Sequence, residues 1–201
     1  MNYIYKLVSI FCLTIVSITS YSQNFGFQFY QGVNKTLVSI SGENVSPDYT
    51  SNFNSDTRLG FFYGDINKVS FSALVGASTT NAYATNDDIS TSFTNSSLRI
   101  DLPVRYAFPK SFLNSIAVGP SIGLLMSSSQ TVNGLPVRSE DLFSANNFYI
   151  VSEIDFTGYT SKKLNINPYV SYRLMLSNAE MDDDNLKINE LSFGLRMDIN
   201  K

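Results

Sequence analysis

The 201-residue sequence contains no histidine, no tryptophan and a single cysteine. Without histidine, every mechanism that relies on imidazole is excluded: the Ser-His-Asp triad, the Cys-His pair and zinc sites with histidine ligands. Charged residues are also scarce, at 15% of the chain against about 25% in average soluble domains. This shortage, beside an abundance of tyrosine, phenylalanine, serine and asparagine, predicts a single domain whose outer surface does not face water.

Other recognisable chemistry is missing as well. The net charge of -3 gives no electrostatic footprint for nucleic acid. The sequence has no phosphate-binding glycine loop, no dinucleotide fingerprint and no nucleophile elbow. We therefore expect no catalytic residue, no cofactor and no enzymatic activity.

The densest acidic cluster runs from Glu180 to Asn185, and its oxygens are a conceivable calcium site. The spacing differs from that of an EF-hand loop, however. Solvated loop acids are the simpler interpretation, and we predict no metal site.

The N-terminal segment has the features of a secretory signal peptide. A lysine at position 6 precedes the twelve-residue apolar run Leu7–Ile18, and Ser20 and Ser22 are small residues at the positions that a signal peptidase reads. Cleavage is expected before Gln23. The alternative, a retained membrane anchor, is disfavoured because a spanning helix needs about 20 apolar residues.

This prediction divides the chain into a signal peptide, residues 1–22, and one domain, residues 23–201. Cys12 is removed with the signal peptide, and its neighbours do not form the small-residue motif of a lipoprotein signal. The mature chain then has no thiol, which excludes disulfides, thiolate catalysis and cysteine metal sites.

From Gln23 onward, apolar residues recur with a period of two, which is typical of β-strands with one face in an apolar environment. The clearest case runs from Leu98 to Phe108. The eight predicted strands are Asn24–Val33, Thr57–Gly64, Val69–Ser78, Leu98–Phe108, Phe112–Ser127, Phe148–Thr157, Asn165–Leu176 and Leu191–Ile199.

The connections between these strands alternate in length. The short turns are residues 65–68, 109–111 and 158–163, and the long connections are residues 34–56, 79–96, 128–147 and 177–187. An even strand number with this alternation places the long loops at one end, and the short turns and both termini at the other. The sequence therefore predicts an all-β fold, an eight-stranded antiparallel up-and-down transmembrane β-barrel with four long, exposed loops.

The uncharged stretch from Ser111 to Val137 needs separate consideration, because it resembles a transmembrane helix. Gly119, Pro120 and Gly123 interrupt its apolar part, which is long enough for a tilted barrel strand but too short for a spanning helix. Proline donates no ladder hydrogen bond, so we expect a local irregularity such as a bulge at Pro120.

The polar faces of the strands carry arginine, and each arginine facing lipid would cost roughly 2 to 4 kcal/mol near the bilayer midplane. The polar faces must therefore point into the barrel, where buried charges require partners. Asn165, Asn167 and Tyr169 are expected to complete the hydrogen bonding. We interpret the charged set as a structural polar plug; a proton path or a catalytic carboxylate pair is the alternative. The predicted lumen network comprises Arg99, Asp101, Arg105, Glu153, Asp155, Arg173, Arg196 and Asp198.

Aromatic residues lie beside two of the short turns. Phe108 and Phe112 flank one turn, and Tyr63 precedes another. This position is typical of an interfacial aromatic girdle. A stacking platform for sugars or bases is the alternative.

Two consecutive segments carry a family resemblance. Ser97–Phe108, followed by Ile116–Gly123, resembles the PorT-like outer-membrane β-barrel family of Bacteroidota, as do the segments Phe25–Phe27 and Leu191–Arg196. The resemblance covers nearly the whole mature chain and implies a porin-like barrel in the cell outer membrane. It implies no active site, and we infer no role in protein secretion from it.

We therefore expect a non-enzymatic, monomeric outer-membrane barrel with a filled lumen, whose partner is outer-membrane lipid and whose external loops bind or shield. One alternative is a secreted soluble barrel of the lipocalin kind, with an apolar ligand inside. The shortage of charge argues against that alternative. The other is a histidine-free outer-membrane enzyme that acts on lipid or peptide.

Overall fold

The structure is a computed structural model, and it describes residues 25–41, 49–86, 89–137, 146–177, 179–181 and 184–200. The predicted signal peptide and Cys12 lie outside these residues. Every regular element within the described ranges is a β-strand. No helix in this part of the chain has the length and apolar character needed to cross a membrane.

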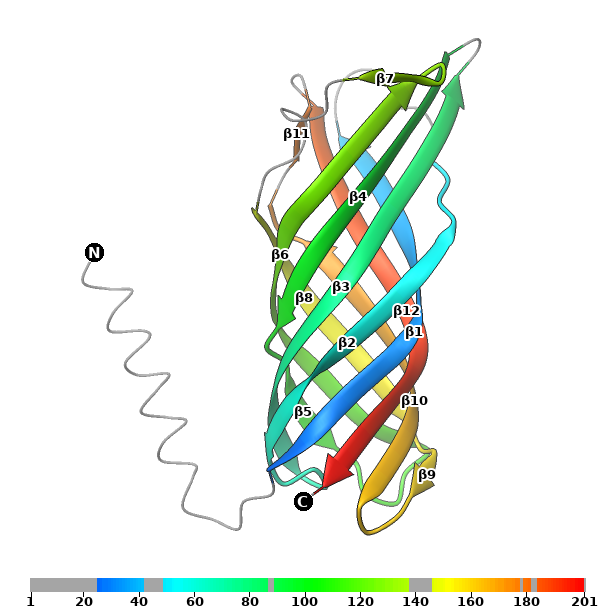
Figure 1. The fold of residues 1–201 in the computed structure, drawn as a ribbon. Helices are drawn as coiled ribbons and strands as arrows, with labels where there is room; N and C mark the ends of the chain where they lie inside the picture. Colours follow the sequence, from blue (N-terminus) through cyan, green and yellow to red (C-terminus); the bar gives the residue numbers. More distant parts are fainter. Residues whose placement is uncertain are drawn as a thin grey trace, which may run out of the picture.

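Eight long strands form a closed antiparallel ring (Figure 1). Each strand pairs with its neighbours in chain order, and β12 closes the ring by pairing with both β1 and β10. The strands β5, β7, β9 and β11 are short additions. The strands are β1 (Phe25–Ser41), β2 (Phe53–Gly64), β3 (Val69–Asn86), β4 (Ile89–Asp101), β5 (Val104–Ala107), β6 (Leu113–Val132), β7 (Leu135–Val137), β8 (Asn146–Phe156), β9 (Tyr159–Thr160), β10 (Leu164–Met175), β11 (Ala179–Met181) and β12 (Asp184–Asn200).

The register of the ring fixes the width of the barrel. Following paired residues once around the ring from Met175 on β10 leads back to Asn165 on the same strand, a stagger of ten residues. Strands staggered in this way are tilted, and eight of them leave an interior that side chains alone can fill. The observed fold is thus the predicted eight-stranded up-and-down barrel.

The short turns lie at one end of the barrel, together with the start of β1 and the end of β12 (Figure 1). We call this the lower end, as it is drawn in Figure 1. In the turn between β2 and β3, the backbone N–H of Asn67 donates to the Asp65 carboxylate at 2.9 Å, and that of Lys68 donates to the Asp65 carbonyl at 2.9 Å. An aspartate at the first position of a tight turn stabilises it in this way.

The strands at the upper end are longer than predicted. The expected exposed loop at residues 79–96 is wrong, because β3 and β4 stay paired from Ser78↔Ser97 up to Asn86↔Ile89. The expected loops at 34–56, 128–147 and 177–187 likewise begin or end as strand, since β1 continues to Ser41, β6 continues to Val132, and β12 begins at Asp184. These segments are rich in serine, threonine and asparagine, a composition that is typical of loops. Yet alternate side chains such as Ala82 and Phe93 are buried, so the strand pattern continues.

The irregularity expected at Pro120 is not in β6 itself. Pro120 lies in regular register opposite Ile150, and the register shifts of β6 occur at other places, opposite Ser96/Ser97 and between Leu113 and Ser115. The interruption lies in the neighbouring strand, because Leu102 and Pro103 separate β4 from β5. A proline in β6 removes a donor, and the ladder is broken where that donor is missing.

Candidate functional site

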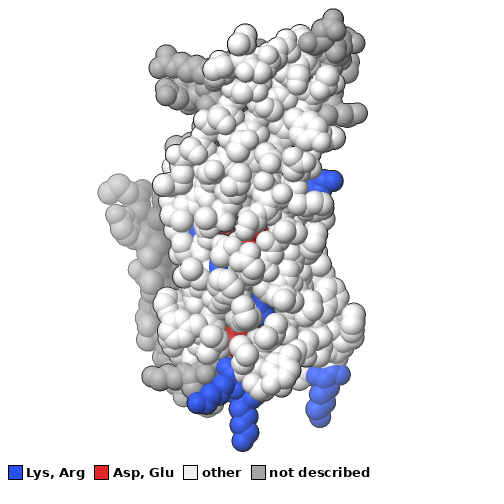
Figure 2. Space-filling view, turned by 45° about the vertical axis from the view of Figure 1, so that its right-hand side comes forward, with Lys and Arg blue, Asp and Glu red and all other residues white. Residues whose placement is uncertain are grey.

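The outer wall of the barrel is apolar. Along β12, Phe193, Leu195 and Ile199 are each 42–50% exposed, while the alternate residues Ser192 and Arg196 are buried. The same alternation holds around the ring, and the wall is almost free of surface charge in Figure 2. Outward apolar side chains elsewhere on the wall include Phe27, Leu59, Phe61, Val75, Leu102, Val104, Ile116, Val118, Ile150, Ile154, Val170 and Leu174.

Aromatic side chains gather near the lower end of this wall. Phe112 is 78% exposed and packs against Phe156, with ring centroids 5.4 Å apart. Tyr106 and Phe108 pack edge to face at 5.1 Å. Side chains of this kind anchor a barrel at the membrane interface, so the predicted girdle residues Phe108 and Phe112 are placed as an interface requires.

The structure places all eight predicted network residues inside the barrel. Each of these side chains is at most 3% exposed, and they come from five strands, β4, β5, β8, β10 and β12. Since the barrel is closed, side chains far apart in sequence meet across its axis. The site is a continuous set of ion pairs that fills the middle of the lumen.

The lower half of the network is centred on Asp155. Its carboxylate accepts hydrogen bonds from Arg105 Nε at 3.1 Å, from Arg196 and from the Ser115 hydroxyl. Arg196 also lies 2.9 Å from Asp198 through its Nη2 atom. Two guanidinium groups therefore converge on the same oxygen, Oδ2, of one carboxylate.

Glu153 joins the lower half to the upper half. Its carboxylate accepts hydrogen bonds from Arg105 and from Arg58 Nη1, the latter at 3.3 Å. The hydroxyl of Tyr30 donates to Glu153 at 2.9 Å and accepts from Arg105 at 2.7 Å. The guanidinium of Arg58 also lies over the Tyr30 ring, 4.2 Å from its centroid.

In the upper half, Arg173 donates to Asp101 at 2.8 Å. Its Nη1 atom lies 3.7 Å from Glu190 Oε2. Arg99 makes a two-pronged pair with the same Glu190 carboxylate. Such a bidentate geometry is the strongest form of a guanidinium–carboxylate contact.

Sequence reasoning missed three charged members of the network: Asp56, Arg58 and Glu190, all at most 1% exposed. Arg58 alternates with Leu59 in a predicted strand, so the period of two already indicates that Arg58 points into the barrel. Asp56 and Glu190 lay in or beside predicted long connections, and no inward face was assigned there. The error in the strand ends therefore hid two of the three residues.

The three residues expected to complete the hydrogen bonding have different roles. The Tyr169 hydroxyl donates to Asp56 at 3.2 Å and thus belongs to the network. Asn167 instead accepts from the backbone N–H of Gly158 at 3.2 Å, which ties a short turn to the wall. Asn165 is buried in the lumen near the lower end, opposite Asp198 on β12.

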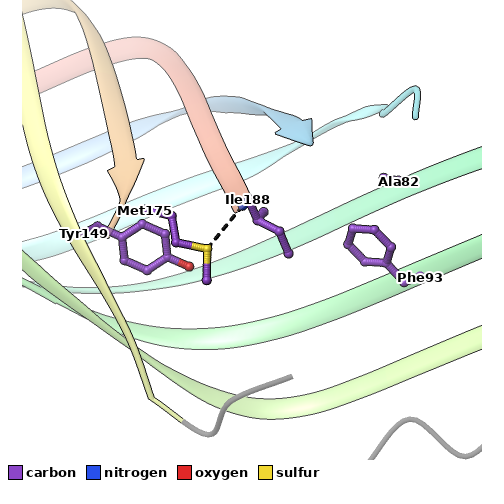
Figure 3. Packing of buried hydrophobic residues seen from close by; sticks show 5 residues of the cluster. All are labelled: Ala82, Phe93, Tyr149, Met175 and Ile188. Carbon is purple, nitrogen blue, oxygen red and sulfur yellow. Dashed lines mark hydrogen bonds between the residues drawn. The ribbon is translucent and has the colours of Figure 1, made fainter. Parts of the chain in front are cut away.

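Above the charged network lies an apolar layer. Phe93, Tyr149, Met175 and Ile188 pack together with Ala82 across the lumen (Figure 3). The Met175 sulfur accepts a hydrogen bond from the Ile188 backbone N–H at 3.2 Å, drawn as a dashed line in Figure 3.

The network is poorly suited to moving protons. It links its carboxylates through guanidinium groups, and arginine does not deprotonate in proteins. The described lumen holds six carboxylates and five guanidinium groups, so the charges nearly cancel. The arrangement can fix side chains in place and exclude water, which is the behaviour of a plug.

No cluster of three or more potential metal ligands occurs among the described residues. The acidic segment from Glu180 to Asn185 is the densest group of carboxylates in the sequence. Asp182 and Asp183 lie outside the described residues, so the structure does not place that segment's carboxylates.

A closed ring of eight strands with a charged interior and an apolar exterior defines a membrane-spanning β-barrel. The class follows from the strand pairing and from the polarity of the two faces described above.

Comparison with solved structures returns small outer-membrane proteins at low similarity. OprG from Pseudomonas aeruginosa is 11% identical, with 89% of this chain and 94% of that one covered and a TM-score of 0.45. Neisserial surface protein A is 14% identical, with 85% and 95% covered and a TM-score of 0.44. The outer membrane protein AlkL, solved in DMPC bilayers, is 10% identical, with 91% and 93% covered and a TM-score of 0.43. No family model and no curated protein matches the chain.

Proposed function

We propose that the protein is a non-enzymatic, monomeric barrel of a bacterial outer membrane, with its short turns facing the periplasm. The observation that carries the proposal is the inversion of polarity: arginines and carboxylates are inside, and a belt of apolar side chains is outside. The resemblance to the PorT-like barrels of Bacteroidota and the signal-peptide pattern of residues 1–22 support the same location.

The barrel acts as a closed anchor and not as a pore. Its lumen is filled by ion pairs in the middle and by the apolar layer of Phe93, Tyr149, Met175 and Ile188 above them. Because every predicted network carboxylate is buried against a guanidinium group, none is free to act as a general base on a substrate. This argues against the outer-membrane enzyme.

The upper end is the part of the molecule that presents a binding surface. A tilted strand needs about 9–11 residues to cross a bilayer, and β3 and β6 have 18 and 20 residues. The excess extends beyond the apolar belt as a paired, Ser/Thr-rich sheet made of β3, β4 and β6 (Figure 1). A rigid projection of this kind suits binding or shielding at the cell surface.

The lipocalin-like alternative requires an apolar ligand cavity inside the barrel and a water-facing exterior. The structure has the opposite arrangement, with five buried arginines inside and exposed apolar side chains outside. This polarity leaves no place for an apolar ligand in the charged middle of the lumen.

Cell fractionation, followed by electrophoresis with and without boiling, tests the location and the closed fold. We expect the protein in the outer-membrane fraction, with a mobility that changes on boiling. Planar-bilayer recording then tests the anchor, and we expect no stepwise conductance. A soluble protein without a mobility shift would contradict the location, and regular channel openings would contradict the filled lumen.

A further inference from the structure

A hollow in the outer wall lies beside a close backbone approach. Where β4 gives way to β5, the chain at Leu102 and Pro103 approaches Gly119 of β6 closely. A Cβ atom on Gly119 would lie 2.3 Å from the Leu102 carbonyl oxygen and 2.5 Å from Pro103 Cα. Glycine is therefore required for this approach. Leu102, Pro103 and Gly119 at this approach also line a groove on the outer surface.

The groove has a volume of about 320 Å³, which lies within the roughly 300–1,000 Å³ of small-molecule sites. Its lining is apolar and comes from five strands and the β4–β5 break. Phe25 and Phe61 form one wall, with rings stacked at 5.5 Å. Ala73, Val104 and Val118 line the remainder, and all three are exposed on the outer side of the barrel.

The lower end of the barrel carries excess positive charge. Lys68, Lys110, Lys162 and Lys163 lie in or beside the three short turns, and basic side chains project from this end in Figure 2. Among the described residues, the ion pair at this end joins Lys68 to Asp65 at 3.8 Å. Lys110 lies in the turn between β5 and β6, where its ammonium group is placed to meet a partner outside the chain.

Lys110 also has an unusual backbone. Its φ is 70°, in the left-handed region that glycine and asparagine adopt more easily than lysine does. Local backbone stability alone would favour glycine or asparagine at position 110. A lysine at this position therefore points to a role for its charge.

The length of chain between groove and lysine is enough to cross one leaflet of a bilayer. Lys110 follows Val104 of the groove by six positions, a span of at most about 20 Å. The hydrocarbon of one leaflet is about 15 Å deep. Tyr106 and Phe108 lie between the two, where interfacial aromatic residues are expected.

Resting on the membrane location proposed above, we infer that this face binds one anionic phospholipid of the leaflet on the short-turn side. Its acyl chain fills the groove between Phe61 and Val118, and its phosphate contacts Lys110. Anionic headgroups are favoured over zwitterionic ones by the charge of this end. A single lysine at a membrane surface corresponds to about a fivefold preference.

The test uses the mature chain reconstituted into nanodiscs that contain equal amounts of phosphatidylglycerol and phosphatidylcholine. After extraction into detergent, native mass spectrometry counts the lipids that stay bound. We expect one retained phosphatidylglycerol per barrel, about fivefold preferred. Lys110→Asn, which suits a positive φ, should abolish the preference, and Lys110→Gly provides a second variant. Ala73→Leu, which fills the groove, should reduce total retention severalfold.

Two matched variants control for charge and bulk. Lys162→Asn removes a lysine from another turn, and Val170→Phe adds bulk to the wall outside the groove; both should retain lipid as the wild type does. Equal retention of the two lipids by the wild type, or equal losses for Lys110→Asn and Lys162→Asn, would overturn the inference. A mobility shift on boiling shows that each variant is folded. A folded membrane barrel without lipid preference refutes this site alone, whereas a protein without the shift refutes the proposed function.

Discussion

Arg99 and Glu190 form a buried ion pair in which Arg99 depends on Glu190 more than Glu190 depends on Arg99. Arg99 is held by Glu190 in a bidentate contact, and the nearest aromatic ring, that of Tyr149, has its centroid 5.6 Å away. Glu190 has a second cation within reach, because Arg173 Nη1 lies 3.7 Å from its carboxylate. Removing Glu190 therefore leaves the buried Arg99 charge without a carboxylate partner, whereas removing Arg99 leaves Glu190 beside Arg173.

The expected changes in the free energy of unfolding follow from this difference. Glu190→Leu leaves an uncompensated buried guanidinium and should lower the free energy of unfolding by about 3–5 kcal/mol. Arg99→Met leaves Glu190 beside Arg173 and should cost about 1–3 kcal/mol. The double variant removes both charges and fills the space with apolar atoms, so it should lie within about 1 kcal/mol of the wild type.

Urea unfolding in lipid vesicles measures these differences. The chain has no tryptophan, so unfolding is followed by circular dichroism and by the fraction of protein that keeps its unboiled mobility. The double variant is its own control, since it changes the same two positions. If the two single costs simply added in the double variant, the pair would not be a coupled buried ion pair, and the reasoning would be refuted.

Three further predictions use the same unfolding assay or planar-bilayer recording. Leu195→Arg, on the lipid-facing side of β12, should cost about 2–4 kcal/mol, and a cost below about 1 kcal/mol would argue against lipid contact. Gly119→Ala should cost about 1–3 kcal/mol because its Cβ would meet the Leu102 carbonyl. Gly134→Asn should be nearly neutral, because a Cβ there meets no atom within 4 Å and asparagine tolerates the φ of +76°; equal losses at the two glycines would contradict the close-approach argument. Met175→Ala should cost about 2–5 kcal/mol and still give no conductance, since the ion pairs below continue to fill the lumen; channel openings in this variant would show that the apolar layer alone closes the barrel.

Much of the barrel could be predicted from the sequence because the period of two is strong within the bilayer span. Along Leu191–Ile199, large apolar residues alternate with Ser192, Gly194, Arg196 and Asp198, and the strand, its two faces and its inward charges all follow. The cost of an arginine in lipid then decides which face points inward. The inward direction of Arg105, Arg173 and Arg196 is a consequence of that energy.

The upper ends of the strands could not be predicted in the same way. Above the apolar belt, small polar residues are interleaved with buried apolar ones such as Ala82 and Phe93, so the hydrophobic signal is weak although the backbone pairing continues. The pairing of Asn86 with Ile89 is an example. Which carboxylate meets which guanidinium also depends on the stagger of the ring. Residues such as Tyr30 and Glu153 meet only because strands β1 and β8 face each other across the lumen.

Site-directed spin labelling along β12 tests the central claim, that the wall is apolar outside and charged inside within a bilayer. Residues 23–201 contain no cysteine, so single cysteines are introduced at positions 191 to 197 and labelled in vesicles. Their accessibility to oxygen and to a water-soluble relaxation agent is then compared. We predict that oxygen accessibility alternates with a period of two, high at Leu191, Phe193 and Leu195 and low at Ser192 and Arg196. A flat profile, or high water accessibility at the outward positions, would contradict the account.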